Sequence, residues 1–111
     1  FKAEVVNGFA QIGDYRLATA VDLNKLSDRY LEFGIRPEHI RVQGDSGDNT
    51  LRVDFVGFDD LGSTRVLNCL FAGELIKVKV ARSFEIPKQG LIDITLPKDN
   101  LLAYRDGLQV L

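Results

Sequence analysis

Few residues of this chain have side chains suited to catalysis. Cys69 is the only cysteine and His39 the only histidine, so the chain cannot form an internal disulfide or a Cys/His zinc site. Gly44-Asp45-Ser46-Gly47 could hold a nucleophilic serine, but such a serine needs a histidine base and an aspartate that orients it. Because Gly, Asp and Ser are also ordinary loop residues, we interpret this segment as a loop and expect no catalytic residue.

The other candidate ligand groups are acidic loop residues. Asp45, Asp48, Asp59 and Asp60 lie in two polar segments, and neither has the spacing of a calcium-binding loop with its distal glutamate. The sequence also contains neither G-x-x-x-x-G-K-[ST] nor G-x-G-x-x-G, the patterns that bind phosphate groups. We therefore expect no metal and no cofactor to be bound by these residues.

Three phenylalanines could stack on nucleic-acid bases. Phe55, Phe58 and Phe71 lie in expected strands, but burial in a core is the commoner use of aromatic side chains. The 14 Lys and Arg against 16 Asp and Glu give a net charge of −2, which provides no basic surface for phosphates. We expect core positions and no nucleic-acid partner; we also expect a buried, unreactive Cys69 and a structural hydrogen bond for His39.

Length and composition indicate one soluble globular domain. A folded chain of 111 residues buries roughly 66% of the surface of its unfolded form, which is enough for a core. The sequence has no apolar run of membrane-spanning length and no secretory signal. It begins with Phe1 and enters a strand at once, so we expect a piece of a longer cytoplasmic protein.

Alternating apolar and polar residues, separated by turn signals every eight to twelve residues or so, predict seven to nine short strands. Lys2–Val6, Phe9–Ile12 and 15–21 form an expected meander, with a hairpin at Asn7-Gly8. A loop with one helical turn, capped by Asp22, is expected over 22–29. A strand over 30–36 should end at Pro37, and further strands should follow between the turns at 59–62, 72–73, 87–90, 97–100 and 106–107.

The second half of the chain has the pattern of a small barrel. The alternation over 51–58 changes phase at Gly57, which predicts a β-bulge that bends the strand. The polar segment 44–49 is the expected boundary between a shorter part, 1–43, and a longer part, 50–111, within a single domain. We predict an all-β fold, with an OB-like small barrel and an additional short N-terminal β-subregion.

Three segments resemble one protein family. Gly34-Ile35-Arg36-Pro37-Glu38-His39 resembles the signature of the TOBE (transport-associated OB) domain, the C-terminal regulatory domain of ATP-binding subunits of maltose and glycerol-phosphate ABC importers. The segment 56–62 is similar to the family's V-x-x-[ED]-x-L-G, through Asp59, Leu61 and Gly62, although Asp59 replaces the usual Glu. Pro87, Gly90 and the segment 96–104 resemble the family's closing strands, with Tyr104 in place of the usual Phe.

The resemblance implies a non-catalytic regulatory and dimer-stabilising domain. The parent subunit, a transport ATPase that uses ATP and magnesium, would pair with its twin at the inner face of the plasma membrane. Its partners would be the membrane subunits of a carbohydrate or polyol-phosphate importer, and regulatory proteins. The transported substrate and the regulator do not follow from the sequence.

Physical reasons for the signature can be given residue by residue. Gly34 allows close approach of another group to the strand, Ile35 should point inward, and Pro37 ends the strand and keeps Arg36 extended. Arg36 and Glu38 could form an ion pair or contact a second subunit; exposed, such a pair is worth only about 0–1 kcal/mol.

Two other kinds of function stay open. Related barrels bind oxyanions between subunits, but Ser63, Thr64 and Lys77, the candidate ligands, are scattered in the sequence. A single-stranded nucleic-acid-binding OB fold is the second alternative, and the acidic composition disfavours it.

Overall fold

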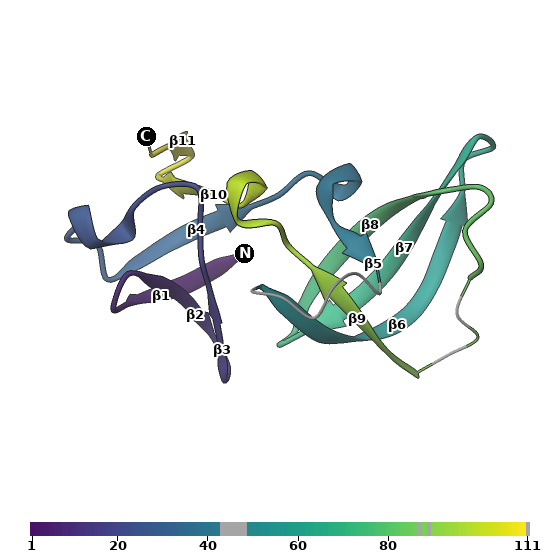
Figure 1. The fold of residues 1–111 in the computed structure, drawn as a ribbon, viewed down its shortest axis with the longest axis horizontal. Helices are drawn as coiled ribbons and strands as arrows, with labels where there is room; N and C mark the ends of the chain where they lie inside the picture. Colours follow the sequence, from purple (N-terminus) through teal and green to yellow (C-terminus); the bar gives the residue numbers. More distant parts are fainter. Residues whose placement is uncertain (43–48, 87, 89, 111) are drawn as a thin grey trace.

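The computed structural model describes residues 1–42, 49–86, 88 and 90–110, and the fold is all-β (Figure 1). The strands are β1 (Lys2–Val6), β2 (Phe9–Ile12), β3 (Tyr15–Leu17), β4 (Tyr30–Gly34), β5 (Arg41–Val42), β6 (Thr50–Asp60), β7 (Thr64–Phe71), β8 (Glu74–Ala81), β9 (Gly90–Thr95), β10 (Leu102–Arg105) and β11 (Leu108–Gln109). Three single-turn 3-10 helices connect them: η1 (Leu23–Lys25), η2 (Pro37–His39) and η3 (Lys98–Asn100). The predicted fold class is confirmed.

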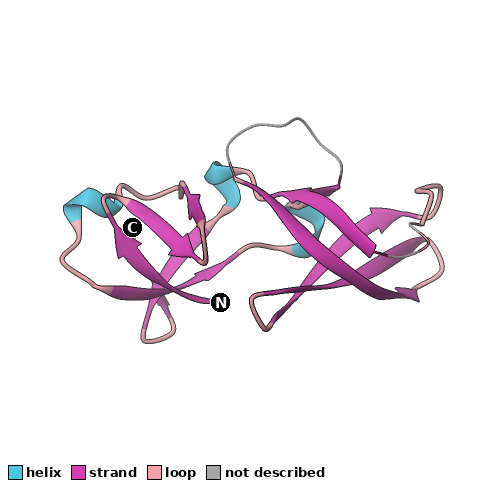
Figure 2. Cartoon of the chain, turned by 90° about the horizontal axis from the view of Figure 1, so that it is seen from below, coloured by secondary structure: helices cyan, strands magenta, loops and turns pink. Residues whose placement is uncertain are grey.

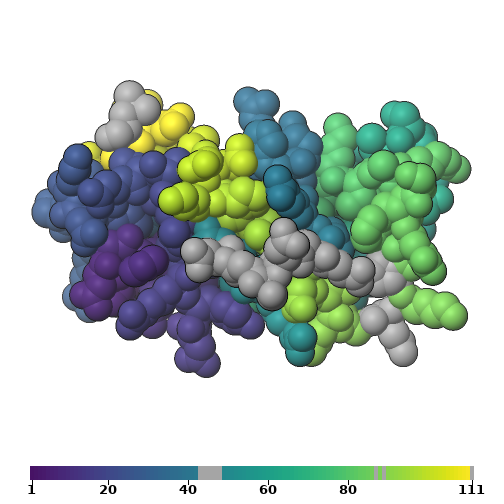
Figure 3. Space-filling model, viewed as in Figure 1, coloured from purple at the N-terminus to yellow at the C-terminus, as the bar shows by residue number. Residues whose placement is uncertain are grey.

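The strands form two antiparallel sheets that lie side by side along the molecule (Figure 2). The first sheet has the order β11-β10-β4-β1-β2-β3, and the second has the order β5-β9-β6-β7-β8. The sheets divide the chain differently from the expected boundary at 44–49, because β5 joins the second sheet while β10 and β11 return to the first. The first and last strands, β1 and β11, therefore lie in the same half of the molecule, where Figure 3 shows purple and yellow atoms.

Short hairpins explain much of the first sheet. The expected turn at Asn7-Gly8 is confirmed: both residues have positive φ, 51° and 84°, as a type I′ turn requires. The turn at Asp106-Gly107 has the same conformation and joins β10 to β11. Antiparallel pairing of β10 with β4 then attaches this last hairpin to the rest of the sheet.

The second sheet is curled into a half-barrel, consistent with an OB-like small barrel. The predicted bulge is confirmed, since the pairing of β6 with β7 shifts register between Phe55 and Gly57. The two edges of this sheet are β5 and β8. The turn η2 directly precedes β5 and packs against β8, so it spans the opening between the two edges.

One hydrophobic core serves both sheets. Its largest side chains include Phe33 from β4 and Leu17 from β3, with Leu51, Leu67 and Ile94 from the second sheet. Because these residues belong to a single cluster, each sheet buries its apolar face partly against the other. The aromatic rings of Tyr15 and Phe71 meet edge to face across this junction, with centroids 5.4 Å apart.

Asn49 connects the two sheets. Its side-chain oxygen accepts a hydrogen bond from Ala18 N at 2.7 Å, and its Nδ2 donates to Ala18 O and Leu96 O at 2.7 and 2.8 Å. Among the described residues, Asn49 is the one buried polar side chain. Asn49, the last residue of the expected boundary segment, is therefore buried at the junction of the sheets, while 44–48 lie outside the described residues.

Two predicted strands are shorter in the structure. The strand expected over 15–21 ends at Leu17, because the backbone of the next residue, Ala18, is bonded to the Asn49 amide. The strand expected over 30–36 ends at Gly34. The helical turn expected near Asp22 is confirmed as η1, whose first N–H groups include Asn24 N bonded to the Asp22 side chain.

Candidate contact site around η2

The turn η2 is held by local backbone geometry and by one buried anchor. Pro37 is its first residue, and Arg36 before it is extended, as the residue before a proline is expected to be. His39 N donates to Arg36 O at 2.9 Å, which closes the turn. Ile40 follows and is buried, so the turn is fixed to the core while Arg36, Glu38 and His39 stay exposed.

The expected close approach at Gly34 is confirmed. A Cβ atom at this position would lie 3.3 Å from the ring carbon Cε2 of Tyr104. Gly34 pairs with Leu102 of β10, and Tyr104 lies on the same strand. The first and third of the segments that resemble the importer family therefore meet through this contact. Ile35 is half-buried and packs against the core, in agreement with its predicted direction.

A shallow hollow lies on one side of η2, and we call it the η2 groove. Pro37 and Glu38 line it together with Asp59 and Leu61, from the end of β6 and the turn after it. The remaining lining residues come from Asp60 and from the facing strands β7 and β8: Val66, Lys77 and Lys79. Residues of the first and second family-like segments thus share one surface.

A second hollow lies on the other side of the same turn. Arg36, Pro37 and His39 line it together with Asp99 and Tyr104. Residues from each of the three segments that resemble the importer family, although distant in the sequence, therefore lie around η2, whereas Gly90 of the third segment lies at the start of β9 and Pro87 lies outside the described residues. No single segment could have predicted this grouping, because it depends on the pairing of β10 with β4 and on the packing of η2 against β8.

The turn after β6 is rigidly held. Gly62 donates its N–H to the Asp60 carboxylate at 2.9 Å. Its backbone has a φ of 92°, which a residue with a side chain would adopt only with strain. Arg82 donates to both oxygens of Asp60 and to Gly62 O. The Gly62 N–H is the main cause that holds the pKa of Asp60 below its usual value, and the positive charges of Arg82 and Arg65 act in the same direction.

This arrangement presents Leu61 to solvent. The side chain is 61% exposed at the tip of the turn, where the backbone N–H of Leu61 donates to Thr64 O. Neighbouring Asp59 accepts a hydrogen bond from Asn68 at 3.2 Å. The turn after β6 thus places an exposed leucine on a segment fixed by several hydrogen bonds.

The charges of the signature lie at the surface. Of the two possibilities for Arg36 and Glu38, the ion pair is not formed, and both residues are exposed, Arg36 just before η2 and Glu38 within it. The pKa of Glu38 is lowered first by a hydrogen bond with its own backbone N–H, and then by the charges of His39, Lys79 and Arg36. The Glu38 carboxylate therefore stays ionised and available at the rim of the η2 groove.

The remaining candidates have structural roles or none. Cys69 is fully buried, as predicted, and burial raises the pKa of its thiol to about 11, so it is unreactive. His39 is exposed, and its ring forms no hydrogen bond with the described residues, contrary to the expectation. Phe55 and Phe71 pack against the core, but Phe58 is 45% exposed and lies under the Arg65 guanidinium.

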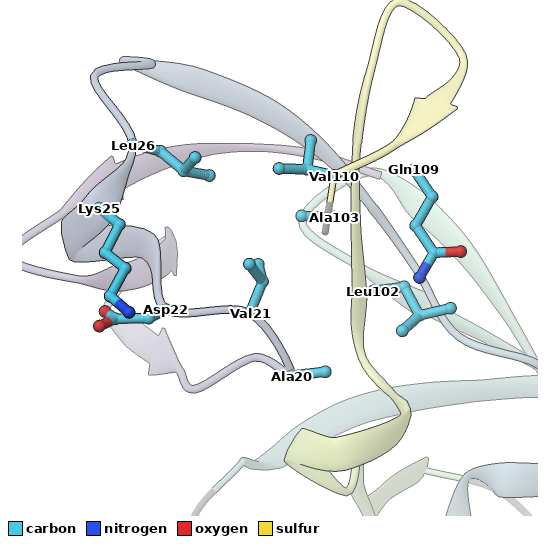
Figure 4. A pocket seen from close by; sticks show the side chains of 9 residues that line it. All are labelled: Ala20, Val21, Asp22, Lys25, Leu26, Leu102, Ala103, Gln109 and Val110. Atoms are coloured by element: carbon cyan, nitrogen blue, oxygen red, sulfur yellow. The ribbon is translucent and has the colours of Figure 1, made fainter.

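Another hollow lies within the first sheet and was not predicted. It has a volume of about 400 Å³ and opens between the segment around η1 and the last hairpin (Figure 4). Val21 and Leu26 face Ala103 and Val110 across it, so its walls are mainly apolar. Segments some 80 residues apart form the two walls, and for that reason no local sequence pattern indicates it.

The described residues include no group of three or more acidic, histidine or cysteine side chains placed to bind a metal ion. In the same part of the chain, no helix is long and apolar enough to span a membrane. The chain matches no model of a known protein family, and no curated protein matches it either. The resemblance to the importer family therefore depends on the three motif segments.

Proposed function

We propose that this chain is the non-catalytic regulatory and dimer-stabilising domain of the ATP-binding subunit of an ABC importer for carbohydrates or polyol phosphates. The observation that carries the proposal is the grouping of residues from the three family-like segments around η2. If the likeness of these segments were accidental, nothing would require Pro37, Asp59 and Tyr104 to lie within one small region of the fold.

The surface around η2 has the properties of a contact site between proteins. It combines an exposed leucine, a proline-fixed turn and charges of both signs at its rim, with Glu38 and Lys79 near one another. Such a surface binds mainly by burial of its apolar centre, and the rim charges set orientation and specificity. A domain that stays in contact with its twin would raise the effective concentration of the two ATPase halves for each other.

The experiment compares dimer dissociation constants of the ATP-binding subunit with and without residues 1–111, by sedimentation equilibrium. We expect weaker dimerisation of the shortened subunit, and equal constants would contradict the proposal. Leu61→Glu in the full subunit tests the surface, with Leu108→Glu as the matched control, since Leu108 is a similarly exposed leucine on the other sheet. We expect roughly a tenfold or greater loss from Leu61→Glu, because the contact would bury the new carboxylate without a partner, and little change from Leu108→Glu.

A further inference from the structure

The hollow that lies on the other side of η2 from the η2 groove is formed where two turns meet at one end of the first sheet. Its lining includes Gly34 of β4 and Leu102 of β10, which pair with each other. Because these strands are antiparallel, η2, which follows β4, and η3, which precedes β10, lie at the same end of the sheet. Residues of both turns line the hollow, which we call the polar hollow.

Six of the ten residues that line the polar hollow have polar side chains. They are Arg36, His39, Asp99, Asn100, Tyr104 and Gln109. None of these side chains forms a hydrogen bond or an ion pair with another described residue. A single polar side chain in this condition is ordinary at a protein surface, where water satisfies it. Six that line one hollow can instead bind one molecule together.

The polar hollow has the size and the mixed lining of a small-molecule site. Its volume is about 610 Å³, and such sites measure about 300–1,000 Å³. Ile35, Pro37 and Leu102 supply apolar surface between the polar groups, and Gly34 adds no side chain. The hollow therefore offers both contact area for a carbon skeleton and hydrogen-bonding groups that fix its orientation.

The charges of the lining disfavour a ligand that carries a net charge. Arg36 and Asp99 have opposite charges, which cancel when His39 is neutral. An anion would be attracted by Arg36 but repelled by Asp99, and a cation would be attracted by Asp99 but repelled by Arg36. A ligand without net charge avoids both repulsions.

The uncharged groups distinguish a polyhydroxylated ligand from a zwitterion. The amides of Asn100 and Gln109, the Tyr104 hydroxyl and a neutral His39 ring each provide both a donor and an acceptor. A hydroxyl group also donates one hydrogen bond and accepts up to two, so several hydroxyls on one skeleton match this lining. A small zwitterion such as a free amino acid could pair with the two charged side chains but would leave the other four without partners.

We propose that the polar hollow binds a neutral polyhydroxylated molecule, a sugar or a sugar alcohol. Arg36 donates to its hydroxyl oxygens, Asp99 accepts from its hydroxyl groups, and the amides of Asn100 and Gln109 do both. The site follows from its lining residues and does not depend on the importer assignment. It would give the chain a small-molecule ligand on one side of η2, in addition to the protein that the η2 groove contacts on the other.

The test titrates glucose, galactose, trehalose and sorbitol against the chain and follows the amide chemical shifts. Glucose 6-phosphate, glucosamine and serine are the anionic, cationic and zwitterionic comparisons. We expect one of the neutral polyols to bind most tightly of all the probes and to shift amides within 34–39 and 99–104. The proposal is overturned if none of the neutral polyols binds, if the shifts are confined to other surfaces, or if a charged or zwitterionic probe binds more tightly.

Two variants test the assigned roles. Asn100→Ala should weaken binding of the polyol about two- to tenfold, as loss of one hydrogen bond does. Asp99→Asn leaves the hollow with a positive charge and should raise the affinity for glucose 6-phosphate relative to glucose about two- to fivefold. Asp14→Asn is the matched control, at an exposed aspartate between β2 and β3, and should change neither affinity. Circular dichroism checks that each variant keeps its fold, and wild-type affinities in both test variants would place the ligand elsewhere and contradict the proposal.

Discussion

At the scale of single residues, burial decides what the few reactive side chains of this chain can do. Cys69 lies on the inner face of β7 opposite Phe55 of β6, and is fully buried there. Its thiol has a raised pKa because the thiolate would lose hydration in this position. The same residue on the outer face of the strand would be an ordinary reactive thiol, so orientation within the strand determines its chemistry.

The thiol of Cys69 predicts a pH dependence of stability. Its pKa rises from 9.0 to about 11 on folding, so the folded state holds the proton more tightly than the unfolded state. The resulting stabilisation is complete below pH 9 and is lost as the pH rises towards 11. The free energy of unfolding of the wild type, relative to Cys69→Ala, should therefore fall by about 2–3 kcal/mol across this range. Urea titrations at several pH values measure it, and parallel curves for the two proteins would contradict the assignment.

At the scale of elements, the hairpins show how far local sequence determines local structure. The turns at Asn7-Gly8, Ala72-Gly73 and Asp106-Gly107 all have positive φ at both residues. Asn and Asp tolerate this conformation through short polar side chains, whereas Ala72, with φ of 50°, does not. The turn between β7 and β8 therefore contains a local strain that the other two lack.

Ala72→Asn should relieve this strain. We expect the free energy of unfolding to rise by about 0.5–1 kcal/mol, because asparagine is favoured at the first position of a type I′ turn. Asn7→Ala is the converse variant, at an equally exposed site, and should lower stability by a similar amount. Thermal unfolding of both variants measures the effect, and a destabilised Ala72→Asn protein would show that the turn is not the source of strain.

The elements also mark the limit of prediction from sequence. The hairpins, the bulge at Gly57 and the capped turn at Asp22 were predicted because each depends on neighbouring residues. The η2 groove was not, because Val66 and Lys79 reach it through strand pairing across the second sheet. Local patterns give the direction of a side chain on its own strand, but they do not show which distant strands lie beside it.

At the scale of the whole molecule, the shared core and Asn49 join the two sheets into one unit. The sequence suggested a division at 44–49, since this segment is the most polar of the chain. The polarity of this segment could not show whether a polar side chain lies in solvent or is buried and bonded to backbone groups that no strand pairs with. The Asn49 amide bonds Ala18, beyond the end of β3, and Leu96, beyond the end of β9, and so satisfies buried groups from both sheets.

Replacement of Asn49 should therefore weaken both sheets together. Asn49→Ala leaves three hydrogen-bonding groups of Ala18 and Leu96 without partners, and we expect a loss of about 2–4 kcal/mol. Asn49→Ala loses stability for two reasons, the missing hydrogen bonds and the strain of alanine at a φ of 66°. Asn49→Gly separates them, because glycine also lacks the amide but tolerates this φ. Asn100→Ala is the control, at a residue whose side chain forms no hydrogen bond within the described part of the chain.

The chain provides a separate probe for each sheet. All its tyrosines, Tyr15, Tyr30 and Tyr104, lie in the first sheet, and its one cysteine lies in the second. Tyrosine fluorescence and Cys69 labelling in urea should give the same midpoint, and Asn49→Ala should shift both equally. If only one midpoint moved, Asn49 would stabilise only one of the two sheets, which would contradict its role at the junction.

The return of β10 and β11 to the first sheet also has a consequence for synthesis. A ribosome releases the chain from its N-terminus, so β4 emerges long before β10, its neighbour in the sheet. Until residues 102–105 leave the exit tunnel, the hydrogen-bonding groups along one side of β4 have no strand to pair with. An unpaired strand side invites pairing with other nascent chains, so premature termination before Leu102 should yield an aggregating product.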